Sequence, residues 1–156
     1  MIDIPFDVSY HFNEDLQDIS NNPAEMEKAM TFLQSQLTGD RTVGRHRIKL
    51  LGLFGTYARM LKKLAAAEQA LTSAIELSEL LGDRRLKTAN MIRLAHVYQW
   101  QQNYTLSEAL FEEVITACQE DLDLASYLAS RKFYREVLLH LTHLKAYRDK
   151  RGCALG

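Results

Sequence analysis

Three residues near the C-terminus have the types and the spacing that a metal site needs. Glu136, His140 and His143 stand at i, i+4 and i+7, which places them on one face of a helix. A carboxylate and two imidazoles are ligand types that hold zinc. The same pattern is typical of a half-exposed polar face on a terminal helix, and we favour that second interpretation. We therefore expect no metal site.

Catalytic signatures are otherwise missing from the sequence. It contains no glycine-rich phosphate loop, no Gly-x-Ser-x-Gly elbow, no His-Glu-x-x-His pair and no Cys-x-x-Cys pair. Cys118 and Cys153 have no metal-type spacing, so they are expected to be free thiols in a reducing compartment. These observations predict a protein that is not an enzyme, with no catalytic residues and no cofactor.

Charged residues are strongly segregated along the chain, although the formal net charge is only −1. Residues 41–67 and 84–107 carry bases and no acid, whereas residues 68–83 and 108–123 carry acids and no base. The end of the chain is basic again, with Arg131, Lys132 and Arg135. One such block is usually a solvated face, but alternation of five blocks leaves a basic binding surface equally open.

The elements that carry these charges follow an internal repeat of 40 residues. Phe54-Gly55 aligns with Leu94-Ala95 without a gap, and four further pairs share the same offset. Small residues at fixed places allow two helices to approach closely, and apolar residues at i, i+4 and i+7 give each helix one buried stripe. The pattern predicts helical hairpins side by side, with helices near 46–62, 64–81, 85–101 and 104–119.

The repeat resembles the tetratricopeptide repeat family. The second copy falls on the signature positions with Met91, Leu94, Ala95, Tyr98, Tyr104, Ser107, Phe111 and Val114. The first copy does so with Phe54, Gly55, Leu64, Ala67, Leu71 and Ala74. It departs from the pattern at Ala58, where an aromatic is usual. The period of 40 resembles the long-linker branch, in which a Leu-Gly-Asp turn like Leu81-Gly82-Asp83 follows the second helix.

This resemblance implies an all-α, right-handed superhelical stack of seven or eight antiparallel helices. Asn22 and Pro23 predict the start of an earlier helix that runs to Leu37. Large residues of the repeat, including Tyr98, Leu94 and Phe54, should be buried. The expected divisions of the single domain are 1–22 (an arm or short helix), 23–47 (a first helix and linker), 48–87 and 88–121 (the repeats), and 122–156 (capping helices with a break near His140 or none).

The resemblance also implies where a ligand would bind, because the first helix of each repeat lines the concave groove in that family. The expected groove residues are Lys49, Thr56, Arg59 and Met60 from the first copy, and Ile92, Arg93, His96, Gln99 and Trp100 from the second. Arg59 and Arg93 have no acid on their own helix, so we expect their guanidinium groups to be free and exposed. For Trp100, groove contact and packing on a neighbouring helix are both open.

The N-terminal segment has the opposite charge and a different period. Its first 27 residues contain acids and no base, and every second residue from Ile2 to Phe12 is a large apolar or aromatic one. Period two predicts an extended segment, which we expect to lie as a strap across the first helices. A short helix starting after Ser9 competes for its second half, and a strand there has no expected sheet partner. The arm also has the composition of an acidic ligand for the groove.

Length and composition support one domain. The chain has 156 residues, of which 47% are hydrophobic and 25% charged, with two prolines and seven glycines. That is enough chain for a sizeable core and too little Pro and Gly for a loop-rich β-sandwich. No run of about eighteen apolar residues is present, and Asp3 and Asp7 stand where a secretory signal would be basic or apolar. We expect a cytoplasmic location and no membrane contact.

The leading functional hypothesis is therefore a non-enzymatic adaptor that binds an acidic peptide or protein segment in a basic groove. The alternative is a nucleic-acid or phospho-ligand in the same groove, where Trp100 and His96 could stack on a base. Nucleic acid is the less favoured partner because the sequence pI is near 6.5. Apolar stack ends also suggest a homodimer.

Overall fold

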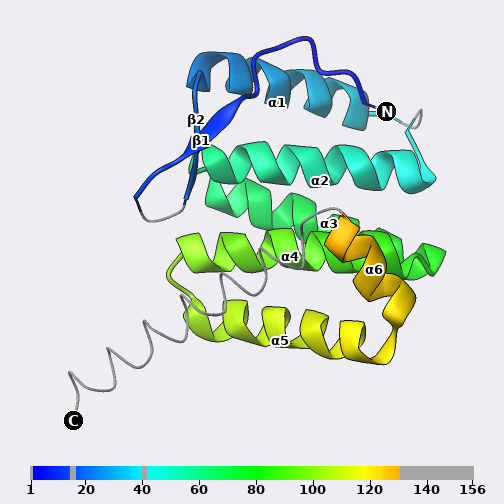
Figure 1. Ribbon diagram of the computed structural model, residues 1–156. Coiled ribbons are helices and arrows are strands. Elements are labelled where there is room, and N and C mark those ends of the chain that lie inside the picture. The colour runs from blue at the N-terminus through cyan, green and yellow to red at the C-terminus, as the bar shows by residue number, and fades with distance from the viewer. Residues whose placement is uncertain (1, 15–16, 40–41, 131–156) are drawn as a thin grey trace.

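The computed structural model describes residues 2–14, 17–39 and 42–130, and these form a layered stack of helices with a small hairpin at one end (Figure 1). Each helix packs mainly against its neighbour in sequence, so the all-α class is confirmed. The right-handed superhelix stays a prediction. The elements are β1 (Tyr10–Phe12), β2 (Asp18–Ser20), α1 (Pro23–Leu37), α2 (Gly44–Met60), α3 (Leu64–Leu81), α4 (Arg84–Trp100), α5 (Tyr104–Glu120) and α6 (Leu122–Ser130).

The two central hairpins share one register with an offset of 40 residues. Helix α2 spans 44–60 and α4 spans 84–100, while α3 begins at Leu64 and α5 at Tyr104. The turns match as well, because Lys62 and Gln102 both have φ of +62°. In each turn the following residue donates its backbone N–H to a carbonyl five positions back, at 2.8 Å in both copies. The predicted hairpin pair and its helix bounds are confirmed to within two residues.

Local capping explains where several helices begin and end. The Asn22 side chain accepts a hydrogen bond from Glu25 N–H and Pro23 is the first residue of α1, as the sequence predicts. Gly82 ends α3 with φ of +68°, a conformation that Gly adopts without strain. Asp83 then caps α4 by accepting from Leu86 N–H.

The apolar core follows the repeat. Met26, Leu33 and Leu71 are fully buried in a cluster shared by α1 to α4, while Phe111 and Val114 are fully buried in a second cluster formed by α4, α5 and α6. Leu94 is buried as expected. Phe54 and Tyr98 are only half-buried, so their prediction is wrong. Both pack on the rim of the first cluster rather than inside it.

The N-terminal segment corrects another expectation. No helix starts after Ser9; instead β1 pairs antiparallel with β2, with Tyr10 opposite Ser20 and Phe12 opposite Asp18. The strand therefore has a sheet partner within its own segment. The strap itself is present, since the apolar side chains of residues 2–8 are half-buried and the polar ones exposed. Those apolar side chains, Ile2, Ile4, Phe6 and Val8, pack against the first core cluster.

Several expectations lie outside the described residues. These are the three-residue metal pattern Glu136, His140 and His143, the basic end from Arg131, and the capping helices beyond Ser130. Within the described part, no helix is long and apolar enough to cross a membrane. The described residues also contain no group of three or more His, Cys, Asp or Glu placed to hold a metal ion.

Candidate partner-binding face

Helices α2 and α4 lie against each other and present one shared surface, called here the α2–α4 face. From α2 it comprises Lys49, Gly52, Thr56 and Arg59, and from α4 it comprises Asn90, Arg93 and Trp100. The α2 residues recur at i, i+3, i+7 and i+10, which places them on one side of the helix. Two contacts fix the alignment with α4: Gly52 against Asn90 and Arg93, and Arg59 against Trp100.

Arg59 lies at the end of this face that is nearest the hairpin. Its guanidinium donates two hydrogen bonds to the Asp18 carboxylate of β2, at 2.5 Å from Nη1 to Oδ1 and 2.8 Å from Nη2 to Oδ2. The guanidinium carbon lies 5.0 Å from the Trp100 ring centroid. The planar fork of arginine suits both a bidentate carboxylate and an aromatic face.

The expectation that Arg59 is free and exposed is wrong. Its side chain is 6% exposed and that of Asp18 is 17% exposed. The sequence expectation considered partners on the same helix only, whereas the carboxylate comes from a strand 41 residues earlier. A buried pair of this kind gives little net stability, but removing one partner leaves an uncompensated charge and costs about 3–5 kcal/mol.

Arg93 lies in the middle of the face. It is half-buried, and its Nη1 donates to Asn90 Oδ1 at 3.0 Å. Asn90 is buried and in turn donates to the Leu86 carbonyl at 2.9 Å. A Cβ on Gly52 would stand 2.8 Å from Asn90 Oδ1 and 2.9 Å from Arg93 Nη1. The close approach of the two helices here therefore depends on glycine.

Besides Arg59, four of the expected groove residues do not lie open on this face. Met60 is buried in the first core cluster and Ile92 is fully buried in the second, which also contains residues of α6. His96 is buried beside the Phe111 ring, at 5.6 Å between centroids. Gln99 is half-buried, and its Oε1 is enclosed without a hydrogen-bond partner among the described residues. Because α4 packs against helices on several sides, much of its surface belongs to the core.

The remaining expected residues lie as follows. Lys49 is exposed and has no ion pair with any described residue. Thr56 is half-buried, and its hydroxyl donates to the Gly52 carbonyl at 2.8 Å. Trp100 is half-buried, and its ring lies under the Arg59 guanidinium. The structure thus brings Lys49, Thr56, Arg59, Arg93 and Trp100 together on the two helices.

Many charged side chains of the segregated blocks form ion pairs with one another. Arg45 Nε donates to Asp83 Oδ2 and Arg84 Nη1 to Asp121 Oδ2, both at 2.8 Å. In both cases the other carboxylate oxygen caps a helix, by accepting from Leu86 N–H at 3.0 Å or Leu124 N–H at 3.1 Å. We call these two pairs the Arg–Asp ladder. In the sequence, the separation between Arg45 and Asp83 nearly equals that between Arg84 and Asp121. This similarity is a signal from which the ladder could have been predicted.

Several other bases of the two blocks also have partners within the described residues. Lys63 pairs with Glu27 of α1, and Lys87 pairs with Glu79 of α3 at 3.1 Å. Arg85 lies over the Tyr127 ring at 4.9 Å from its centroid. Arg47 donates to the Leu37 carbonyl at 3.0 Å. Internal contacts therefore take up most of the positive charge of the two basic blocks.

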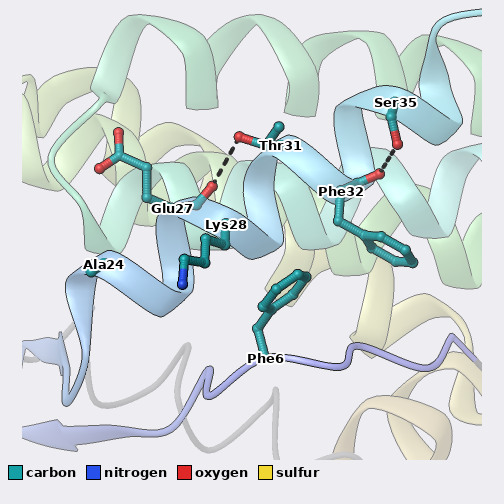
Figure 2. Close-up of a pocket in the computed structure, with 7 residues that line it drawn as sticks. All are labelled: Phe6, Ala24, Glu27, Lys28, Thr31, Phe32 and Ser35. Carbon is teal, nitrogen blue, oxygen red and sulfur yellow. Dashed lines mark hydrogen bonds between the residues drawn. The ribbon is translucent and has the colours of Figure 1, made fainter.

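Two pockets lie away from the α2–α4 face. One, of about 600 Å³, opens between the strap and the outer side of α1, where Phe6 points toward Phe32 with ring centroids 6.1 Å apart (Figure 2). Its other lining residues recur at helical spacing along α1: Ala24, Glu27, Lys28, Thr31 and Ser35. The second, of about 290 Å³, is polar and is formed by the Arg–Asp ladder. Sequence reasoning missed both because each depends on how separate segments meet.

Comparisons with known proteins do not identify the chain. No protein-family model, no curated protein and no solved structure matches it. The likeness to tetratricopeptide repeats therefore depends on the residues quoted above and on the 40-residue register of the two hairpins.

Proposed function

We propose that the protein is a non-enzymatic adaptor whose α2–α4 face binds an acidic, extended segment of a partner protein. The observation that supports this most directly is the Arg59 arrangement, in which a guanidinium on an aromatic ring takes a carboxylate in bidentate geometry. Lys49 at the open part of the same face adds an exposed positive charge. The tetratricopeptide-like register supports the same proposal, since repeats of helical hairpins commonly present such binding surfaces.

Protein is the partner that the charges favour over nucleic acid. A nucleic-acid groove needs several bases available to successive phosphates. Here Arg45, Arg84 and Lys87 are paired with carboxylates on the same chain. One bidentate site, with a lysine about three helical turns away along α2, suits a carboxylate side chain in a peptide better than a polyanion.

The test is capture of partners from extract of the native cell, followed by mass spectrometry. The bait is the full chain carrying Lys49→Glu, which reverses a charge on the face. Its matched control is Lys28→Glu, which makes the same net charge change on the outside of α1, where the Lys28 side chain is 66% exposed. We expect the control to retain the partners of the unaltered chain and Lys49→Glu to lose them. The captured complex should also weaken as salt rises.

Two results would contradict the proposal. Equal recovery of the same partners by both variants would place binding elsewhere on the molecule. Recovery of nucleic acid that is lost on nuclease treatment would favour a polyanion ligand instead.

A further inference from the structure

The hairpin that covers Arg59 carries the features of a ligand rather than those of a core element. Strands β1 and β2 have three residues each, and a two-stranded hairpin of this kind is marginally stable by itself. Its main polar link to the helices is the Asp18 pair with Arg59. Both aromatic side chains of β1 are exposed, Tyr10 at 49% and Phe12 at 59%.

The register of the hairpin shows which side chains face the helices. Asp18 and Ser20 lie two residues apart, so they point to the same side of β2. Asp18 meets Arg59, and Ser20 is buried at 6% exposure. Ile19 between them points the other way. The segment therefore presents a carboxylate and, two positions later, a small residue.

We infer that the β1–β2 hairpin is an internal surrogate ligand, which occupies the Arg59–Trp100 site and competes with a partner segment of the same form. That form is an extended strand with an acidic residue and a small residue two positions after it. This inference depends on the proposed function of the α2–α4 face, which it deepens by naming the partner element and its regulation. Displacement of the hairpin exposes the site, and its return closes the site.

The energetics favour such an exchange. An incoming carboxylate takes the place of the Asp18 carboxylate on the same two guanidinium nitrogens, so Arg59 has an ion partner both before and after the exchange. The hairpin side loses the burial of Ser20 and the partial burial of Gln17, Asp18 and Ile19. Segments with few buried apolar contacts are those that open most readily in a native protein. The apparent affinity for a partner is reduced by the fraction of molecules whose site is open.

The experiment uses the full chain and a synthetic peptide of its own residues 9–21, which contains the surrogate segment. Trp100 is the single tryptophan of the chain, so its fluorescence reports binding at the site directly. Asp18→Asn removes the internal carboxylate charge with little change of shape. We expect this variant to bind the peptide at least about tenfold more tightly than the unaltered chain does, because more of its sites are open.

Three controls define the result. Asp18→Glu retains the charge and should keep the weak binding of the unaltered chain. Asp7→Asn removes a different acid of the arm, one whose carboxylate accepts hydrogen bonds from Ser9, and should change nothing. A peptide carrying its own Asp18→Asn change should bind the opened protein at least about tenfold more weakly, because it lacks the carboxylate that Arg59 takes.

A second variant opens the site by another route, so a folding defect in Asp18→Asn would not decide the result. His11→Pro removes the His11 N–H from the strand pairing with Ile19 while it leaves Asp18 unchanged. It should also strengthen peptide binding, and hydrogen exchange of the β2 amides should be faster while α3 and α4 stay protected.

The outcomes separate the two proposals. Peptide binding of equal strength to the unaltered chain and to both opened variants would overturn the surrogate role and leave the binding face in place. Absence of binding to opened variants whose helices remain folded would overturn the surrogate role as well. The capture experiment with Lys49→Glu and Lys28→Glu would then decide separately whether the face binds a partner.

Discussion

Phe111 is the largest fully buried side chain of the described residues. It packs between α4 and α6 within the second core cluster and lies beside His96. Phe111→Ala removes that volume and leaves a cavity, because neighbouring helices relax only in part. We expect a loss of about 3–5 kcal/mol in the free energy of unfolding, measured by chemical denaturation. Leu106→Ala, at a side chain that is 46% exposed on the same helix, is the control and should change stability little.

Gly55 gives a prediction of the opposite kind, in which added volume is harmful. A Cβ at this position would lie 2.5 Å from Leu71 Cγ and 2.7 Å from Leu71 Cδ2. Ala in mid-helix is favoured over Gly by about 0.5–1 kcal/mol, but overpacking of a core costs about 1–3 kcal/mol. Gly55→Ala should therefore lower the free energy of unfolding. Leu71→Ala in the same chain should remove the clash, so the two changes together should cost less than the sum of the separate costs.

At the scale of elements, the start of α4 makes stability depend on pH. Burial alone would raise the pKa of Asp83, but hydrogen bonds from Leu86 N–H and from Arg45 outweigh burial and place its pKa below the ordinary 3.8. A carboxyl with a lowered pKa in the folded state stabilises the fold above its unfolded pKa, and this contribution is lost as pH falls through the folded pKa. Asp83→Asn should flatten the fall of stability below about pH 4.

The control for that measurement is Asp123→Asn, which makes the same charge change in the same polar pocket. Thermal unfolding between pH 2 and pH 7 provides the profile for each variant. An Asp83→Asn profile that falls as steeply at low pH as that of the unaltered chain would show that the cap and Arg45 contribute nothing to acid stability.

At the scale of elements, the sequence predicted the helices better than the strands. Helices α1 to α5 were predictable because local signals mark them: Asn22 and Pro23 at one start, Gly82 at one end, and apolar stripes with a 40-residue offset. The β1–β2 pairing was not, because two strands of three residues give too short a pattern to compete with a helix signal. In this region the sequence predicted an extended segment, left a helix after Ser9 open, and missed the strand's partner.

The candidate site was predictable only in part for a related reason. Helical spacing correctly places Lys49, Thr56 and Arg59 on one side of α2. It does not show that Asp18 reaches Arg59, since the two lie 41 residues apart and meet only after the arm folds back. Nor does it show that Ile92 is buried in a core cluster that includes residues of α6. Contacts between distant segments decide which residues of a repeat are open to a partner.

On the scale of the whole molecule, sequential packing predicts that damage stays local. The first core cluster joins α1 to α4, whereas the second joins α4, α5 and α6. Leu33→Ala, at a fully buried site between α1 and α2, should speed hydrogen exchange in those helices and in the hairpin. The amides of α5 and α6 should keep their rates.

Phe111→Ala should give the opposite pattern, with faster hydrogen exchange in α5 and α6 and little change in α1. Mass spectrometry of exchanged fragments distinguishes the ends of the stack. A uniform rise in every helix for either variant would show that the stack opens as one cooperative unit instead.

The Arg–Asp ladder has a consequence for how such a chain grows. Each aspartate of the ladder starts one helix and receives an arginine from the beginning of the previous unit, so neighbouring units are joined by identical chemistry. A duplicated copy of residues 44–83, inserted after Asp83, would bring its own Arg45 and Asp83 and would meet compatible groups on both sides. Gene duplication in steps of this unit therefore adds an arginine and a capping aspartate with each new copy.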